Sequence, residues 1–323
     1  MDVATVSQRC HMMVGQIEKV IVGKRAVLED LLIGILSNGH VLIEDVPGLA
    51  KTLIARSFAR IMDLEFSRIQ FTPDLLPGDI TGSNIYNRAE NTFEFSHGPV
   101  FSHIVLADEI NRASPKTQSA LLEAMQETQV TIEGTSHTLD HPFIVFATQN
   151  PIEFEGTYPL PEAQLDRFLM KMSVGYPDKD NELEILLRRQ DRKTDEVELQ
   201  AVVNREDVIE MQKSVEQVFM SREIGVYIVE IVKATREDNR VQLGASPRGS
   251  LALFKLARSA AALDGRDFVT PEDVKRIAKH GLSHRIMLKP EVWMRDIPEE
   301  DIVSDILQRV PVPRPLGDEN HEP

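Results

Sequence analysis

Residues 40–62 restrict the possible folds of this chain more than any other segment. The apolar run Val41-Leu42-Ile43 leads into the loop EDVPGLAKT, and a helical pattern then continues to residue 62. A buried strand that enters a helix through a loop ending in Lys-Thr is typical of a phosphate-binding loop, because N–H groups at a helix N-terminus surround an anion. The segment therefore predicts an α/β protein with a phosphate site at the end of a strand.

The loop departs from the general pattern G-x-x-x-x-G-K-[ST] at both glycine positions, which Asp45 and Ala50 occupy. Alanine is small, and aspartate tolerates unusual backbone angles, but the sequence offers no further reason for an acid at residue 45. The effect of both residues on affinity stays open, and the alternative reading of this loop is an ordinary strand-to-helix turn with a solvated lysine. We predict that Lys51 reaches the β and γ phosphates of ATP and that Thr52 binds Mg²⁺. The residues predicted to hold the nucleotide here are Asp45, Val46, Pro47, Gly48, Leu49, Ala50, Lys51 and Thr52.

Composition excludes several classes of protein. The chain has 323 residues, enough for two domains, and a net charge of -15, which argues against nucleic acid as a partner because phosphate backbones require clustered Lys and Arg. Cys10 is the only cysteine, so an internal disulfide is excluded. The N-terminal residues lack a signal-peptide pattern, and no apolar run approaches the ~20 residues that a membrane span needs. We expect a cytoplasmic protein without membrane insertion.

The periodicity of apolar residues divides the chain in two. Residues 1–176 predict an α/β core, with helices at 1–40 and 51–62 and buried strands at 40–45, 64–71, 102–109, 142–150 and 169–175. Two hairpins are expected at 84–96 and 129–139. From residue 177 to 312 the patterns are helical only, which predicts a smaller all-α domain, and residues 313–323 form a Pro-rich, polar and flexible tail.

Polar residues follow the apolar strands at the positions where α/β proteins bind ligands. Asp108 and Glu109 end one strand and Asn150 ends another, so we expect Asp108 to hold Mg²⁺, Glu109 to polarise the attacking water and Asn150 to orient it. Arg167 lies on a short predicted helix, and Arg248 lies in the first turn of a helix, where a cation opposes the dipole and an anionic ligand would compensate. The alternatives are ordinary strand-end turns and surface salt bridges.

These features occur in one order, and together they resemble the AAA+ ATPases, most closely the MoxR family. The resemblance covers about residues 10–312. It is carried by the stretches IVGK, EDVPGLAKT, RIQFTPDLLPGDITGSNIYN, GPVF, VLADEINRASPKTQSALLEAMQE, ATQNPIEFEGTYPLPEAQLDRFLMK and GASPRG.

The resemblance implies a P-loop AAA+ core with a parallel sheet, a helix-2 insert at hairpin 84–96, and an all-α lid. It assigns the site residues as follows: Lys51 and Thr52 to Walker A, Asp108 and Glu109 to Walker B, Asn150 to sensor 1, Arg167 to an arginine finger that reaches a neighbouring subunit, Arg248 to sensor 2, and Val22 and Gly23 to adenine contacts. Whether Arg248 acts on its own or a neighbouring subunit's ATP stays open.

Activity and partners are implied in the same way. The family resemblance implies ATP hydrolysis by a homo-oligomeric ring, expected to be a hexamer, with both hairpins directed to its pore. It also implies a chaperone-like role in remodelling or maturing a protein client, in some cases one with a von Willebrand factor A domain. The alternatives are a nucleic-acid motor or loader, and a nucleotide-controlled scaffold that hydrolyses slowly.

Two further features carry no functional prediction. His280 and His284 are four residues apart, but Gly281 lies between them and no third metal ligand is evident, so we expect them to serve a helix C-terminus. Trp293, the only tryptophan, is expected to pack within the lid.

Overall fold

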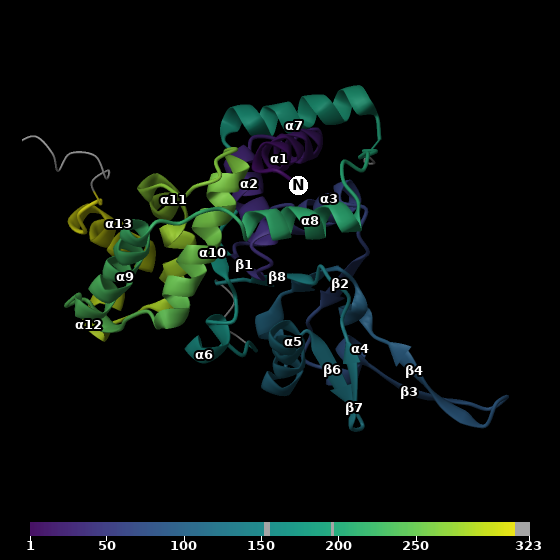
Figure 1. Cartoon of the computed structure of the whole chain (residues 1–323). Coiled ribbons are helices and arrows are strands. Elements are labelled where there is room, and N and C mark those ends of the chain that lie inside the picture. Colours follow the sequence, from purple (N-terminus) through teal and green to yellow (C-terminus); the bar gives the residue numbers. More distant parts are fainter. Residues whose placement is uncertain (152–155, 195–196, 314–323) are drawn as a thin grey trace, which may run out of the picture.

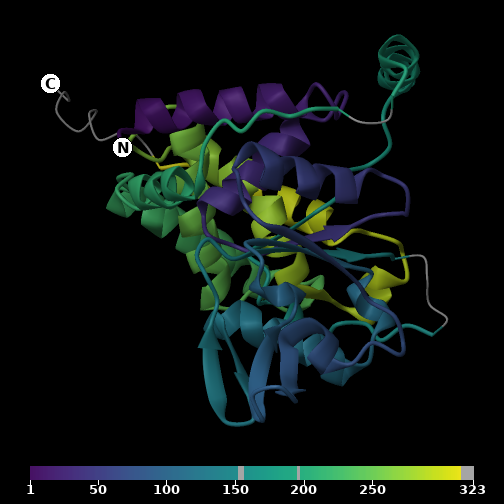
Figure 2. The same ribbon diagram turned by 90° about the vertical axis from the view of Figure 1, so that its right-hand side faces the viewer.

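The computed structural model of the chain describes residues 1–151, 156–194 and 197–313. A parallel sheet forms the centre of the core, and a helical lid lies beside it (Figure 1). Helices α1 to α3 lie on one side of the sheet, and α5 with both hairpins lies on the other (Figures 1 and 2). The predicted P-loop α/β architecture with a helical lid is confirmed.

The central sheet has five parallel strands in the order β2-β5-β8-β1-β9. Their bounds are β1 Val41–Glu44, β2 Phe66–Gln70, β5 Ile104–Asp108, β8 Ile144–Gln149 and β9 Met170–Met172. The central strands β1, β5 and β8 are largely apolar on both faces because helices cover both sides of the sheet. Val41 and Ile43 join the cluster under α2 and α3, whereas Leu42 joins the cluster under α5. All five strands run in one direction, so their carboxyl ends meet at a single edge.

The helices predicted at 1–40 and 51–62 are present, with one division, whereas the short helix Pro77–Thr81 was not predicted. The region 1–40 forms two helices instead of one, because residues 18–24 turn between them. The core helices are α1 Val3–Ile17, α2 Arg25–Leu36, α3 Lys51–Ile61, α4 Pro77–Thr81, α5 Pro115–Glu127 and α6 Glu162–Leu165. Ser114 caps α5 and Pro115 begins it.

Both predicted hairpins are present on the α5 side of the sheet. Their strands are β3 Gly82–Asn87 with β4 Thr92–His97, and β6 Gln129–Ile132 with β7 Thr135–Thr138. The two hairpins contact each other, since Asn84 donates a 2.7 Å hydrogen bond to Glu133 and the Phe95 ring stacks on His137 at 4.0 Å. The β3–β4 hairpin projects farthest from the core (Figure 1), and Phe93 on it is 72% exposed.

After the last strand of the central sheet the chain forms the helices α7 Lys179–Arg192, α8 Arg205–Val215, α9 Arg222–Glu237, α10 Pro247–Leu263, α11 Pro271–Leu282, α12 Pro290–Trp293 and α13 Glu299–Arg309. The prediction of helices alone was wrong in one detail, because β10 Val241–Leu243 pairs with β11 Met287–Leu288. Strands this short carry too little periodicity to be recognised in sequence. Helix α10 packs on α11 and also on α1 and α2, so one hydrophobic cluster continues from core to lid.

The expectations for Trp293 and His280 had different outcomes. The packing prediction for Trp293 is wrong, since the residue is 70% exposed on the short helix α12. His280 lies in the last turn of α11 as expected, and its Nδ1 lies 3.2 Å from the Lys171 carbonyl. No metal-ligating cluster occurs within the parts of the chain that the structure describes. The same parts contain no helix with the length and apolar character needed to cross a membrane.

His40 makes the stability of the core depend on pH. Its Nδ1 accepts a hydrogen bond from the Val145 N–H at 3.1 Å, and its Nε2 lies 3.0 Å from the Met125 carbonyl, which suits the neutral ring. Burial lowers the pKa of His40 from 6.5 to about 4. Between pH 6.5 and 4 the histidine of the unfolded chain binds a proton that the buried ring does not bind. The fold is therefore most stable above pH 6.5 and loses stability as the pH falls towards 4. We expect acid to cost about 3 kcal/mol through this group.

Urea unfolding at several pH values between 7 and 4 measures this effect. The matched variant His40→Gln retains an amide donor and acceptor but does not titrate, so its stability should fall less steeply over this range. Equal slopes in both proteins would contradict the role of His40.

Candidate functional site

The phosphate-binding loop lies between β1 and α3, and its backbone angles explain part of its sequence. Gly48 has φ +85°, and a Cβ there would meet no atom within 4 Å, so conformation and not space favours glycine. Ala50 has φ 56°, a left-handed angle that costs a non-glycine residue about 1–2 kcal/mol. Asp45 is not among the residues with positive φ in the described chain. The suggestion that Asp45 serves an unusual backbone angle is therefore wrong.

Asp45 instead connects the loop to the segment that leads from β9 to the lid. The residue is 8% exposed, and one carboxylate oxygen accepts bonds from Ser173 Oγ (3.0 Å), Val174 N (2.7 Å) and Gly175 N (2.8 Å). The other oxygen accepts from Val46 N at 3.0 Å. A glycine could not make these bonds, so the acid stabilises the loop against the start of the lid.

We expect Asp45→Ala to destabilise the protein by about 3 kcal/mol, because buried donors lose their acceptor. Asp45→Asn should also destabilise it, since an amide NH₂ cannot accept from a backbone N–H. The matched control is Ser173→Ala, which removes one donor and should cost about 1 kcal/mol. Urea unfolding measures all three. Equal costs for Asp45→Ala and Ser173→Ala would contradict this role.

Lys51 bends over the loop that precedes it. Its Nζ donates to the carbonyls of Asp45 at 2.9 Å and Val46 at 3.2 Å. Burial lowers the pKa of the Lys51 ammonium, although the negative charges of Asp45, Asp108 and Glu109 act in the opposite direction. A partly desolvated cation at the N-terminus of a helix is suited to a phosphate.

The two adjacent carboxylates at the end of β5 are fixed by neighbouring strands. Asp108 accepts from Thr148 Oγ on β8 at 2.6 Å and from Arg68 on β2 at 2.7 Å. Glu109 has φ 57° and ψ 50°, and its N–H donates to the same Thr148 Oγ at 2.8 Å. Gln70 on β2 donates to the Glu109 carboxylate at 2.7 Å. A strained angle maintained by such contacts is frequent at functional sites.

Sequence reasoning did not identify Thr148, Gln70 or Arg68. Thr148 next to the end of the apolar strand β8 and Gln70 at the end of β2 gave a signal as polar strand-end residues, whereas Arg68 in the middle of β2 gave none. Parallel pairing of β2 with β5 and of β5 with β8 brings these side chains to the carboxylates, and that pairing is not visible in sequence.

One cavity of about 420 Å³ contains most of the predicted site. Its lining comprises Pro47, Gly48, Leu49, Ala50, Lys51, Thr52, Leu53, Arg68, Asp108, Glu109, Thr148 and Asn150. The loop, both carboxylates and Asn150 therefore meet at the carboxyl edge of the sheet. Within the described chain, the lining of this cavity does not include Arg167, Arg248, Val22 or Gly23.

The two predicted arginines are connected through Asp166. Arg167 directly follows Asp166, and Arg248 Nη1 lies 3.5 Å from the Asp166 carboxylate. Arg285, only 4% exposed, also binds Asp166 at 2.8 Å and donates to the carbonyls of Phe168 and Leu169. The lid thus contacts the segment that carries Arg167, and neither arginine lines the cavity of its own chain.

The segment predicted to contact adenine is covered by the start of α7. A Cβ on Gly23, which has φ +69°, would lie 2.2 Å from Cγ of Asn181. Lys24 Nζ donates to the Tyr176 carbonyl at 2.8 Å. Val22 and Gly23 therefore lie where core and lid meet.

Comparison with known proteins identifies the family of this chain. Residues 40–170 match the profile of the ATPase family associated with various cellular activities (AAA), and residues 233–306 match that of the AAA lid domain. The chain is 52% identical over 301 residues to the uncharacterized protein YeaC of Bacillus subtilis, covering 93% of each chain. It is 44% identical over 308 residues to the chaperone MoxR1 of Mycobacterium tuberculosis, covering 93% of this chain and 81% of the relative.

A solved structure is similar over nearly the whole chain. The crystal structure of a protein assigned as an ATPase from Cytophaga hutchinsonii has a TM-score of 0.90 and 45% identity, with 97% of both chains covered. The fold, the cavity and these relatives lead to one conclusion: the chain belongs to the MoxR family of AAA+ ATPases, and it hydrolyses ATP to ADP and phosphate.

Proposed function

We propose that this ATPase uses hydrolysis to remodel or mature a protein partner, as a homo-oligomeric ring that we expect to be a hexamer in the cytoplasm. One observation supports the ring. Within one chain, Arg167 and Arg248 do not line the cavity that contains Lys51, Asp108 and Glu109. Arginines that do not line the cavity of their own chain are available to complete the site of a neighbouring subunit. This arrangement favours action of both arginines on a neighbouring subunit's ATP.

The proposed roles in hydrolysis follow from the cavity. Lys51 binds the β and γ phosphates together with the loop N–H groups. Glu109 accepts a proton from the attacking water, and Asn150 orients that water. General-base action of this kind contributes about 10²–10⁴ in rate. Gln70 positions the Glu109 carboxylate directly, and Thr148 fixes the backbone N–H of Glu109.

A magnesium ion fits the oxygen groups at this edge. The Thr52 hydroxyl and the Asp108 carboxylate line the same cavity, and Mg²⁺ takes oxygen ligands from one or two side chains together with phosphates and water. When bound, the ion would neutralise phosphate charge. The side chain of Arg68 balances the charge of Asp108 in this structure.

The division of the chain also remains a proposal. We propose a nucleotide-binding core at 1–176 and a lid at 177–312, and the tail predicted at 313–323 lies outside the described residues except for residue 313. The Asp45 contacts to 173–175 support a boundary near 176, because this segment connects the loop to the lid. Val22 and Gly23 stay proposed adenine contacts.

The protein-remodelling role is supported by the β3–β4 hairpin. Phe93 is 72% exposed, Ile85 56% and Tyr86 46%, and the rings of Tyr86 and Phe93 lie 5.3 Å apart across the strands. Exposed apolar side chains on a projecting element are suited to contact an unfolded or flexible client. A client with a von Willebrand factor A domain is proposed from the family resemblance.

A trapping experiment tests this function. We expect Glu109→Gln to bind ATP but to turn over at least 10²-fold more slowly, because it loses the base and retains the size. In a pull-down with ATP it should retain a protein client that Lys51→Ala does not retain. The double variant Glu109→Gln with Phe93→Ala is the matched control, and it should lose that client while still binding ATP. Retention by all three proteins would contradict client binding through the hairpin.

The alternatives give different results. A nucleic-acid motor would bind DNA or RNA with an affinity that falls steeply with salt. A slow scaffold would show no steady-state turnover in the purified wild-type protein. Filter binding with a salt titration and a phosphate-release assay distinguish the three.

A further inference from the structure

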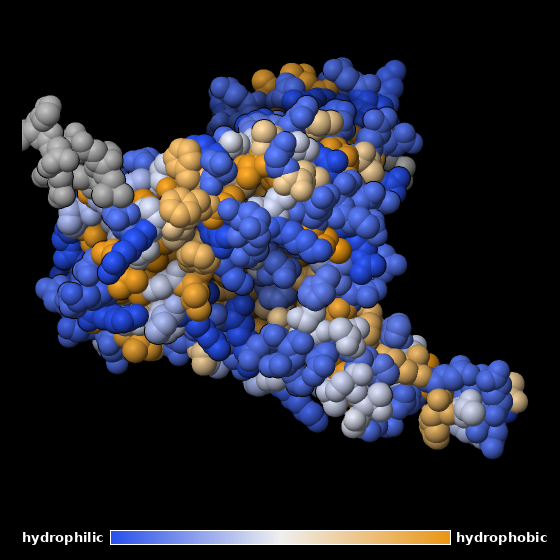
Figure 3. Space-filling model, viewed as in Figure 1, coloured by the Kyte–Doolittle hydropathy of each residue, from blue (hydrophilic) through white to orange (hydrophobic). Residues whose placement is uncertain are grey.

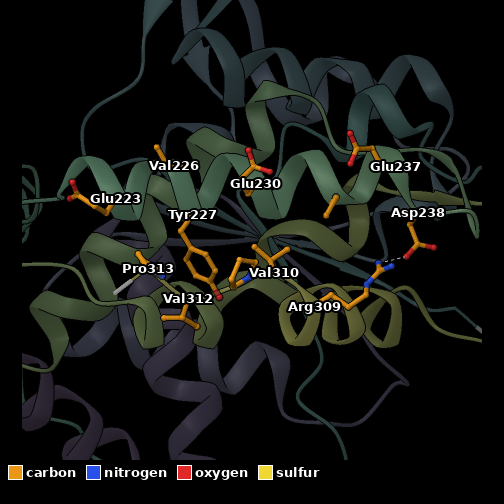
Figure 4. A pocket seen from close by; sticks show the side chains of 12 residues that line it. Glu223, Val226, Tyr227, Glu230, Glu237, Asp238, Arg309, Val310, Val312 and Pro313 are labelled. Atoms are coloured by element: carbon orange, nitrogen blue, oxygen red, sulfur yellow. Dashed lines mark hydrogen bonds and ion pairs between the residues drawn. The ribbon is translucent and has the colours of Figure 1, made fainter. Parts of the chain in front are cut away.

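A groove on the lid, away from the nucleotide cavity, is the strongest unassigned site. It has a volume of about 700 Å³ and lies between helix α9 and the extended segment Val310–Pro313 that follows α13. Figure 4 shows α9 as one wall and this segment as the other. We call this site the α9 groove. In the space-filling view, apolar side chains are exposed across the lid surface (Figure 3), and Val226 of the groove is 52% exposed.

The α9 wall combines the apolar residues Val226 and Ala234 with a regular row of acidic residues. Glu223, Glu230 and Glu237 are seven residues apart along the helix and line the groove together. Seven residues correspond to about 10.5 Å along a helix. Lys233 lies 3.7 Å from Glu230 and 3.8 Å from Glu237, but all three are at least half exposed, so this pairing neutralises them weakly.

Arg309, a positive charge at one end of the groove, is already paired with a carboxylate. Arg309 lies beside Asp238, which also pairs with Arg240 at 2.9 Å. Figure 4 shows Arg309 directed towards Asp238 instead of towards the row of glutamates. The open part of the groove is therefore acidic, and a basic occupant is complementary to it.

Tyr227 supplies an unused polar group. The side chain extends from α9 towards Val310 and Val312 (Figure 4), and the residue is 3% exposed. Its hydroxyl has no hydrogen-bond partner among the residues that the structure describes. An unsatisfied buried hydroxyl costs stability, and an occupant of the groove could satisfy it.

The second wall restricts how an occupant can bind. Pro311 and Pro313 have no N–H groups, so this wall cannot pair regularly with an added β-strand. Recognition must come from side chains, as when an amphipathic helix lies in a groove. A partner helix with Lys or Arg every seven residues would repeat the spacing of the glutamates.

We propose that the α9 groove binds an amphipathic basic helix of a protein partner, with its cations seven residues apart. The apolar face of this helix contacts Val226 and Val312, and its cations pair with Glu223, Glu230 and Glu237. A hydrogen-bonding group on it satisfies the Tyr227 hydroxyl. This binding is independent of the nucleotide site, so it goes beyond the proposed function.

Fluorescence anisotropy with a labelled synthetic helix tests the proposal. The probe is a Leu- and Ala-rich peptide with one serine beside its apolar face and Lys at positions i, i+7 and i+14. One control peptide has Glu at those positions, and another has the same composition with Lys moved to i+2 and i+9. We expect the first peptide alone to bind the full chain, and to bind Lys51→Ala equally well. Its affinity should fall at least tenfold between low and high salt.

Variants locate the binding. Glu230→Lys and Val226→Asp should each weaken binding at least tenfold. Glu123→Lys, a charge reversal on an exposed residue of α5, is the matched control and should leave binding unchanged. Tyr227→Phe should weaken binding about threefold or more while thermal stability stays equal or rises, because the lost hydroxyl has no partner in the free protein.

Three results would overturn the proposal. The first is no binding of the basic peptide. The second is equal binding of either control peptide, which would exclude recognition by charge or by spacing. The third is an equal loss of affinity in Glu123→Lys and Glu230→Lys, which would place the interaction outside the α9 groove.

Discussion

Arg167→Ala is expected to bind ATP with unchanged affinity and to lose about 10³–10⁵ of its hydrolysis rate. An arginine supplied to a neighbouring active site stabilises the charge of the transition state, and a loss of this size corresponds to roughly 4–7 kcal/mol of barrier. The structure motivates the prediction because Arg167 does not line the cavity that contains Lys51 and Glu109. Single-turnover phosphate release and binding of a fluorescent ATP analogue measure the two quantities separately.

Mixed subunits test whether the arginine acts between chains. Arg167→Ala and Lys51→Ala should each be inactive alone. At a mixed interface, however, an intact loop of one chain meets an intact Arg167 of the other, so some activity should return on mixing. The specific activity of the wild type should also rise with protein concentration. Rings that demonstrably mix but stay inactive at every ratio would contradict independent action between neighbours. A monomer with a concentration-independent rate would exclude the ring.

Arg285 provides a structural control for this experiment. It fixes Asp166 and the carbonyls around Phe168, so Arg285→Ala should displace the segment that carries Arg167. It should also lower stability, because Asp166 is left without its nearly buried partner. Arg167→Ala should retain wild-type stability in urea unfolding. A loss of activity without a loss of stability therefore shows that the Arg167 guanidinium itself is needed, and not only an ordered segment around it.

Lys51→Ala is expected to abolish ATP binding at micromolar nucleotide, with affinity at least ~10²-fold lower, or about 3 kcal/mol. The physical reason is that the phosphates lose the only lysine in the lining of the cavity, within the described chain. Folding should change little, since Lys51 donates only to two loop carbonyls. Equilibrium titration with a fluorescent ATP analogue measures the loss.

The matched control for this variant is Ala50→Gly. Ala50 has φ 56°, which glycine adopts without strain, so we expect this variant to fold and to bind ATP at least as well as the wild type. Loss of binding in Ala50→Gly would show that the alanine maintains the loop conformation. Binding as tight as wild type in Lys51→Ala would show that the phosphate-loop assignment is wrong.

The sequence by itself determined the parts of this protein that depend on local pattern. Strand, loop and helix at 40–62 follow from periodicity and from the Lys51-Thr52 pair. Asp108 and Asn150 were placed at strand ends because apolar runs stop there. The carboxyl ends of parallel strands meet at one edge, so the presence of these residues in one cavity was predictable.

Only the tertiary structure decided the contacts that join distant segments. Asp45 binds residues 128 to 130 positions away because β9 lies beside β1, and strand order cannot be read from local periodicity. The support of Glu109 by Thr148 depends in the same way on the pairing of β5 with β8. Trp293 is exposed because α12 is too short to bury it, which its apolar character did not reveal. Local residue patterns specify the elements and the chemical groups, whereas the packing of those elements decides which groups touch.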